Sequence, residues 1–243
     1  MRSGCLLLVV IAGCSGGAEK TKPRPPAVKS NHEMVNPLEL GDEDGDGMWV
    51  EGALGTLDQS AVQAGLSRSM LEFTSCYDRN ARGKPYLCGD VELAFRVTRE
   101  GKIKKVRIKQ SSLGALPVER CILEAARTAT FQRPRGGEAE FSYTVSFNGR
   151  VPVNAWDPGM VKQEIDDNRD KLFIKQEGRE SIPLEVPRGL RVTMYVNRRG
   201  KVVSAGMTAE EEIDEEFSTH FISSVKTIQF EKPEGFVKVT ISW

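Results

Sequence analysis

Histidine is nearly absent from this chain of 243 residues, which contains only His32 and His220. Neither histidine belongs to a motif typical of nucleophilic hydrolases. No Cys-x-x-Cys pair occurs, and both histidines are far in sequence from the cysteines Cys76, Cys88 and Cys121, so a zinc site is not expected. We therefore predict that the protein is not an enzyme and that it needs no metal and no cofactor.

An excess of one charge is also lacking, because 34 Lys and Arg residues balance 34 Asp and Glu residues. A chain without net charge has no overall field that would draw it to nucleic acid. Its 39% hydrophobic and 28% charged residues are those of a soluble globular protein. We expect no nucleic-acid partner.

Long hydrophobic runs are missing, since the apolar segment at residues 6–12 is too short to span a bilayer. It follows Arg2, as in a secretory signal peptide. The next residues, Ile11-Ala12-Gly13-Cys14, resemble a bacterial lipobox, whose cysteine is acylated and becomes the new N-terminus. We predict a signal peptide at 1–13, lipidation at Cys14 and a place on the periplasmic face of the envelope. Ser15 favours the outer membrane over the inner. The alternative is an ordinary signal peptide that happens to carry a cysteine.

Residues 14–47 form a predicted disordered tether, first Pro-rich and basic, then acidic. Its acidic end has Asp42, Asp44 and Asp46 followed by a glycine, which is how an EF-hand loop begins. Ala53 stands where that loop needs a bidentate glutamate. These three aspartates are therefore a weak calcium candidate, and a solvated acidic linker is the favoured alternative.

Two segments of the remaining chain recur at one constant offset. VTREGK at 97–102 returns as VNRRGK at 196–201, and FQRP at 131–134 returns as FEKP at 230–233. The offset is 99 residues in both cases, from 97 to 196 and from 131 to 230. An offset of the length of a domain indicates tandem copies of one small domain rather than a solenoid. We place the copies at 48–150 and 151–243.

Hydrophobic periodicity predicts the same order of elements in each copy. In the first copy we expect a helix opening at residues 57–60, strands at 91–97 and 103–108, a helix at 117–130 and a strand at 139–147. In the second copy we expect strands at 190–196, 201–207 and 239–243, with helices around Val161 and Ile165 and around Phe217, Phe221, Val225 and Ile228. This order predicts an α+β fold in which each copy is a three-stranded antiparallel sheet with two helices on one face.

Several short motifs of the first copy point to one family. They are Gly55-Thr56-Leu57, Cys76-Tyr77, Gly89-Asp90-Val91, Gly101, Val118-Glu119-Arg120-Cys121-Ile122 and Phe131-Gln132-Arg133-Pro134. Together they resemble the AgmX/PglI C-terminal domain family, which is related to the C-terminal domain of TonB. The resemblance implies a TonB-like fold and a non-enzymatic interaction module of the cell envelope or of gliding motility. The second copy resembles only the general TonB-like pattern.

The resemblance also implies a disulfide between Cys76 and Cys121, and an exported protein meets an oxidising compartment in which it can form. The second copy has Lys175 and His220 at the corresponding positions. Cys88 is then left over. It is either a buried thiol without a role or the partner of Cys76 in another pairing.

Charged residues gather in two places. The bases Lys102, Lys104, Lys105 and Arg107 lie on the first hairpin, and acids that include Glu211 and Glu215 precede the last helix. These patches could dock the copies, or two molecules, together. The alternatives are that lysines protect a sheet edge from aggregation and that carboxylates complement a helix dipole.

We expect the protein to bind an envelope protein or peptide by strand addition at a sheet edge, without catalysis. The predicted edges contain Thr144, Val145 and Ser146 in the first copy and Val239, Thr240 and Ile241 in the second. The alternative is a scaffold lipoprotein of a larger envelope or motility machine, bound through its charged patches.

Overall fold

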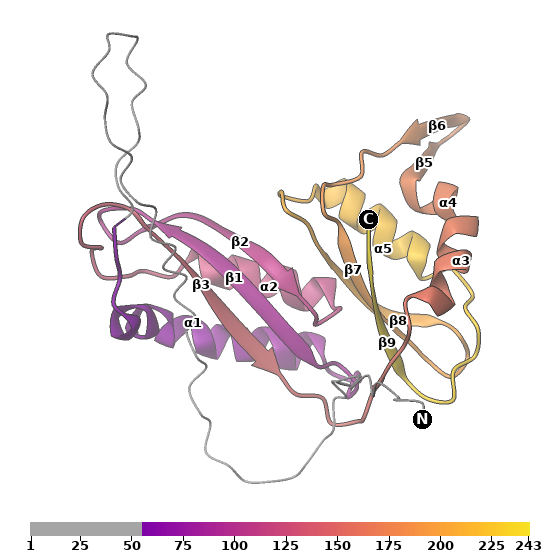
Figure 1. Cartoon of the computed structure of the whole chain (residues 1–243), viewed down its shortest axis with the longest axis horizontal. Helices are drawn as coiled ribbons and strands as arrows, with labels where there is room; N and C mark the ends of the chain where they lie inside the picture. The colour runs from indigo at the N-terminus through magenta and orange to yellow at the C-terminus, as the bar shows by residue number, and fades with distance from the viewer. Residues whose placement is uncertain (1–54) are drawn as a thin grey trace, which may run out of the picture.

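The structure, a computed structural model, describes residues 55–243 of the chain (Figure 1). The predicted signal peptide, Cys14, the tether and the aspartates Asp42, Asp44 and Asp46 lie outside the described residues. We call residues 55–150 the N-terminal unit and residues 151–243 the C-terminal unit. The chain is mixed α+β, as predicted.

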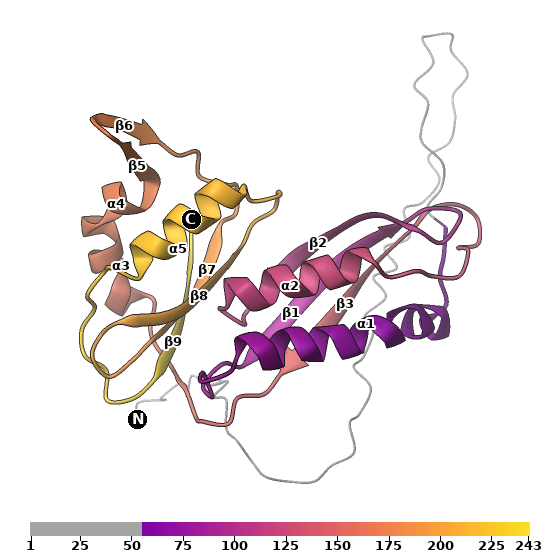
Figure 2. The ribbon, with the colours of Figure 1, turned by 180° about the vertical axis from the view of Figure 1, so that it is seen from behind.

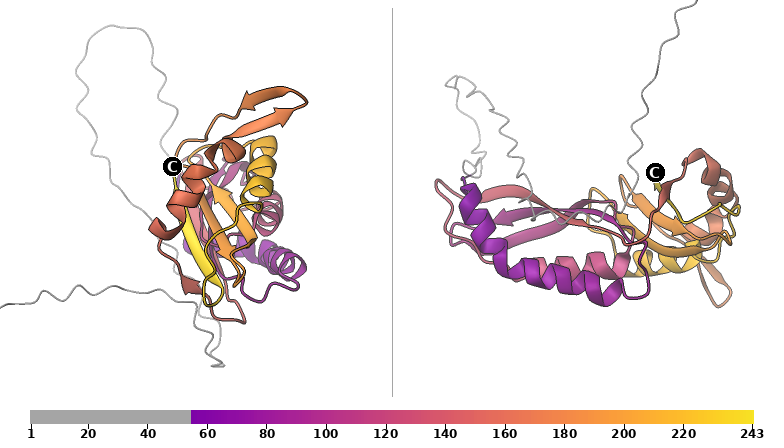
Figure 3. Two further views of the ribbon diagram at one scale, coloured as in Figure 1. Left: turned by 90° about the vertical axis from the view of Figure 1, so that its right-hand side faces the viewer. Right: turned by 90° about the horizontal axis from the view of Figure 1, so that it is seen from below.

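The N-terminal unit has the predicted order of elements. It consists of α1 (Gln59–Asn80), β1 (Gly89–Val97), β2 (Ile103–Ser111), α2 (Leu116–Arg127) and β3 (Ala139–Phe147). The strands form an antiparallel sheet in the order β2-β1-β3. Both helices cover the same face of this sheet, and no helix or strand of residues 55–243 covers its other face (Figures 2 and 3). The sheet and helices predicted for the first copy are thus confirmed.

The two recurring sequence segments contact each other in both units. Phe131 N–H donates to Gly101 C=O at 2.8 Å, and Phe230 N–H donates to Gly200 C=O at 2.9 Å. The glycines have φ values of 85° and 73°, and a Cβ at either would lie 2.1 Å from the carbonyl oxygen of that phenylalanine. Only glycine fits such a turn, so the hairpin and the segment behind it recur as a pair.

The C-terminal unit departs from the three-stranded prediction. Its elements are β4 (Asn154–Ala155), α3 (Gly159–Asp167), α4 (Arg169–Phe173), β5 (Ile174–Glu177), β6 (Glu180–Pro183), β7 (Arg191–Val196), β8 (Val202–Thr208), α5 (Glu215–Val225) and β9 (Val237–Ser242). The sheet has four strands in the order β4-β9-β7-β8, and β4 pairs with β9 in parallel. β5 and β6 form a separate hairpin, which stands away from the sheet in Figure 1. The expected three-stranded sheet with two helices is therefore wrong for this unit.

Local chemistry explains these departures. Asn168 ends α3 and precedes α4, and its Nδ2 donates to Glu164 C=O at 2.8 Å. An asparagine that bonds the backbone in this way competes with helical hydrogen bonds, so the helix breaks there. The two residues of β4 are too few to show a period of two, which is why the sequence pattern missed the strand.

The sheet of the C-terminal unit lies between its own helices and one end of the N-terminal unit (Figures 1 and 3). Residues Val192 to Val196 of β7 are accordingly all buried. Tyr195 belongs to the hydrophobic cluster of the N-terminal unit, and its ring lies 5.3 Å from that of Tyr86. Tyr86 also stacks on Phe236 at 4.7 Å. Apolar contacts that the sequence analysis did not predict therefore join the two units.

Candidate functional site

The outer edge of β3 offers unpaired backbone groups. Gly55 N–H donates to Glu138 C=O on this side, so alternation along the strand turns the N–H and C=O groups of Ser142, Thr144 and Ser146 outward as well. Among residues 55–243, no strand pairs with these three residues on that side. The edge is therefore a row of available donors and acceptors.

The three predicted residues of this edge play different parts. Thr144 is half-buried and Ser146 is exposed, and both present backbone groups outward. Val145 pairs with Val91 of β1, and its side chain is only 5% exposed in the core. Thr144 and Ser146 are thus suited to meet a partner, whereas Val145 holds the strand in place.

The second predicted edge is shorter than expected. β4 pairs with Val237 and Lys238 of β9, and Trp156 N–H donates to Lys238 C=O at 2.8 Å. Val239, Thr240 and Ile241 lie beyond β4, and by the same alternation only Thr240 among them turns its backbone groups outward. This strand offers less of an edge than β3.

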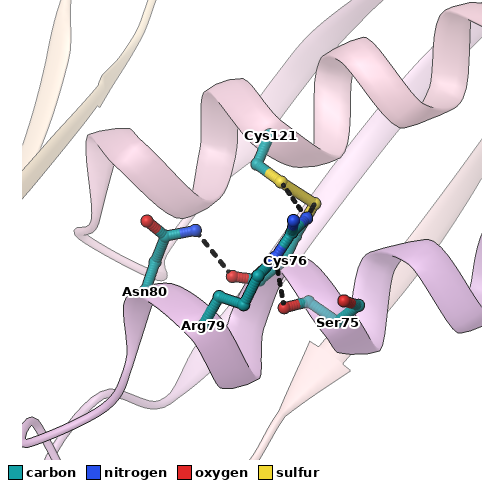
Figure 4. Close-up of a disulfide and its surroundings, with 5 residues drawn as sticks. All are labelled: Ser75, Cys76, Arg79, Asn80 and Cys121. Atoms are coloured by element: carbon teal, nitrogen blue, oxygen red, sulfur yellow. Dashed lines mark hydrogen bonds between the residues drawn. A yellow bond between two sulfur atoms is a disulfide. The ribbon is translucent and has the colours of Figure 1, made fainter.

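A disulfide clamps the two helices of the N-terminal unit. Cys76 on α1 and Cys121 on α2 are bonded, with 5.6 Å between their Cα atoms (Figure 4). Nη2 of Arg79 lies 3.5 Å from Sγ of Cys121. The pair implied by the family resemblance is confirmed, and the alternative pairing of Cys88 with Cys76 is wrong. In the C-terminal unit, Lys175 forms an ion pair with Glu216 of α5 instead.

The predicted docking patches line one groove of about 990 Å³ between the two units. Lys104, Lys105 and Arg107 of β2 lie on one wall, and Glu211 and Glu215 lie on the other. Lys102 is exposed outside the groove, where it forms an isolated bridge with Thr130.

These opposite patches do not pair directly with each other. Lys104 Nζ binds Glu138 of its own unit at 2.8 Å, and Glu211 accepts a hydrogen bond from Arg188 N–H at 2.8 Å. Two arginines of α2 form ion pairs with the acidic wall instead. Arg120 lies 3.3 Å from Glu215, and Arg127 lies 3.7 Å from Glu212. The sequence identified the acids but missed both arginines as their partners.

Hydrogen bonds from side chains to backbone fix the two units against each other. The Tyr195 hydroxyl donates to Cys88 C=O at 2.6 Å and accepts from Cys88 N–H at 3.0 Å. Nζ of Lys238 donates to the same carbonyl at 3.1 Å, and burial lowers the pKa of this lysine. Ser204 donates to Gly114 C=O at 2.8 Å. Buried, satisfied polar groups of this kind specify one arrangement of the units.

Glu119 on α2 is a buried carboxyl at this interface. Its Oε1 accepts from the Ser111 hydroxyl at 2.7 Å, and its Oε2 has no hydrogen-bond partner among the described residues. A Cβ on Gly206 of the other unit would lie 2.3 Å from this carboxyl. Burial raises the pKa of Glu119, and the hydrogen bond from Ser111 opposes that rise. The motif Val118-Glu119-Arg120-Cys121-Ile122 contained this residue without indicating its burial.

The raised pKa predicts a pH dependence of stability. The folded protein keeps the Glu119 proton at pH values where the unfolded chain has lost it, so this group's stabilising contribution is present at low pH and is lost as pH rises. We expect Glu119→Gln to flatten the decline of stability above about pH 4, the usual range of a glutamate. Urea unfolding midpoints over a pH series, with exposed Glu124→Gln as control, measure this. Parallel curves for the variant and the unaltered protein would contradict it.

One serine and one histidine approach each other in α5. Oγ of Ser224 lies 3.4 Å from Nε2 of His220, but the same nitrogen lies 3.1 Å from Lys171 C=O. A carbonyl can only accept, so Nε2 carries the proton and is not free to take one from the serine. The contact ties α5 to α4 and does not form a nucleophile with its base.

The chain matches no known family model, no curated protein and no solved structure. Within residues 55–243, no group of three or more His, Cys, Asp or Glu side chains could hold a metal ion. In the same part of the chain, no helix is long and apolar enough to cross a membrane.

Proposed function

We propose that this protein is a non-catalytic envelope lipoprotein that binds an extended segment of another envelope protein by strand addition. The observation that carries the proposal is the outer edge of β3, where Ser142, Thr144 and Ser146 turn unpaired backbone groups outward. An added strand gains main-chain hydrogen bonds at such an edge, and its alternate side chains give specificity.

Two sequence features support the envelope location. The lipobox-like residues ending at Cys14 favour lipidation on the periplasmic face, and Ser15 favours the outer membrane. The Cys76–Cys121 disulfide is compatible with an oxidising compartment. The AgmX/PglI-like motifs and the recurring hairpin support a pair of TonB-like domains, of which the second has been modified by β4 and the β5–β6 hairpin.

A proline at the edge tests strand addition. Thr144→Pro removes an outward N–H without taking a bond from the β1–β3 ladder, and edge strands tolerate proline in that orientation. We expect photo-crosslinking in cells from a probe at Ser146 to yield an adduct with one envelope protein, and we expect Thr144→Pro to reduce the adduct about tenfold, as loss of one or two hydrogen bonds would.

The matched control is Thr144→Val, which keeps the N–H and should keep the adduct. Thermal melting of each variant separates loss of binding from loss of folding. An adduct that survives Thr144→Pro in full, or that never forms in the lipidated protein, would rule out strand addition at β3.

A further inference from the structure

The groove between the units contains a second free strand edge, which belongs to β2. Asp90 C=O accepts from Ser112 N–H, so every second residue of β1 directs its backbone N–H and C=O groups toward β2. The β2 residues paired with these include Lys105 and Arg107. Val106 and Ile108 therefore turn their N–H and C=O groups away from β1. Both residues line the groove, and no strand among the described residues pairs with them there.

The groove has an apolar floor. Leu116 and Leu123 of α2 line it together with Met207 and Ile213 of the C-terminal unit. Its volume of about 990 Å³ lies at the upper end of the range that ligand sites occupy. A strand added to β2 would place every second side chain over this floor, because side chains alternate between the two faces of a strand.

The charged side chains of the two walls differ in their partners and in the direction in which they point. On the acidic wall, Glu211 is bonded to Arg188 N–H, and Glu212 and Glu215 lie near Arg127 and Arg120. On the basic wall, Lys105 and Arg107 form no ion pair within residues 55–243, because the ten ion pairs of that part of the chain all involve other bases. These two side chains lie on the open face of the sheet, opposite to buried Val106. The bases without an ion pair therefore lie on the open face of the sheet and face away from the floor. Glu210, on the acidic wall, also forms no ion pair among the described residues.

We propose that the groove binds an extended polypeptide segment in which acidic and apolar residues alternate, added as a strand to β2. Its apolar side chains cover the floor formed by Leu116, Leu123, Met207 and Ile213, and its acidic side chains lie opposite Lys105 and Arg107. The site uses another strand than the β3 edge and does not depend on it.

The test uses two fluorophore-labelled synthetic peptides, one of alternating glutamate and valine and one of alternating lysine and valine. In fluorescence anisotropy with the full chain, the glutamate peptide should bind about tenfold more tightly, because two cross-strand charge pairs change from repulsive to attractive. The double variant Lys105→Glu, Arg107→Glu should reverse this preference. The matched double variant Arg99→Glu, Lys102→Glu changes the same charge on the same hairpin outside the groove and should keep it.

Four outcomes overturn the proposal. The first is equal binding of both peptides, and the second is no binding of either. The third is a preference that the double variant leaves unchanged although its melting temperature is normal. The fourth comes from the Thr144→Pro variant, which separates this site from the proposed function. This variant should bind the glutamate peptide normally, and loss of binding would show that the peptide binds at β3. Failure of the peptide test with retained crosslinking at Ser146 would leave strand addition at β3 standing.

Discussion

Replacing Tyr195 by alanine should lower the free energy of unfolding by about 3–5 kcal/mol, as for other large buried aromatic residues. This side chain is completely buried, contacts the Tyr86 ring and satisfies both backbone groups of Cys88. Its removal leaves a cavity in the interface between the units and takes away the hydroxyl that bonds to Cys88 N–H and C=O. We expect the unaltered protein to unfold in one transition and the Tyr195→Ala variant to unfold in two.

Urea unfolding followed by two probes measures this effect. In a background in which the third tryptophan, Trp49, is replaced by phenylalanine, Trp156 and Trp243 report on the C-terminal unit by fluorescence. Far-UV circular dichroism reports on both units. Tyr195→Phe should cost only about 1–2 kcal/mol, since it removes the hydroxyl but keeps the ring. The control is Tyr143→Phe, because the Tyr143 hydroxyl bonds only to the sulfur of Met70 among the described residues, at 3.6 Å. Coincident transitions and a loss of less than about 1 kcal/mol in Tyr195→Ala would show that the interface contributes little.

Removing the disulfide is expected to have an effect of similar size. The bond joins residues that are 45 positions apart, and the chain-entropy relation gives at most about 4 kcal/mol for a loop of that length. For a folded part of this size, that loss lowers the melting temperature by about 8–16 °C. Cys76→Ala with Cys121→Ala should therefore melt well below the unaltered protein in calorimetry under oxidising conditions.

Glu72→Ala is the matched control, because this exposed residue lies on α1 close to Cys76 and should change the melting temperature by about 1 °C or less. The double cysteine variant should keep the edge of β3, because the disulfide joins α1 to α2 and no strand. A melting temperature within about 2 °C of the unaltered protein would mean that the bond restricts the unfolded chain very little.

The N-terminal unit followed closely from its sequence because its signals are local. Alternation in β1, the Gly101 turn and the apolar face of α1 each depend on residues a few positions apart. The last strand of such an order must lie at a sheet edge, so Thr144 and Ser146 could be predicted without a structure. In the C-terminal unit, Asn168 and the short β4 changed the pattern, and neither leaves a periodic signal.

The arrangement of the two units could not be predicted for a different reason. Its hydrogen bonds join the side chains of Tyr195, Lys238 and Ser204 to backbone carbonyls, which every residue carries, so no complementary residue types mark them in the sequence. The charged patches suggested docking, but local partners such as Glu138 and Arg188 satisfy part of that charge. One useful signal was present: the run from Val192 to Val196 is almost wholly apolar, which is typical of a strand covered on both faces.

The double burial of β7 has a consequence for the order in which the chain acquires its structure. Polypeptides are synthesised from the amino end, and domains generally fold as they emerge. The N-terminal unit can therefore be complete before β7 exists, and Tyr86 and the start of α2 are then ready to receive it. If the order of the two units in the chain were exchanged, the sheet that contains β7 would form first. One of its faces would then be exposed to neighbouring chains until the other unit had been synthesised. The present order shortens that interval and so limits aggregation during biogenesis.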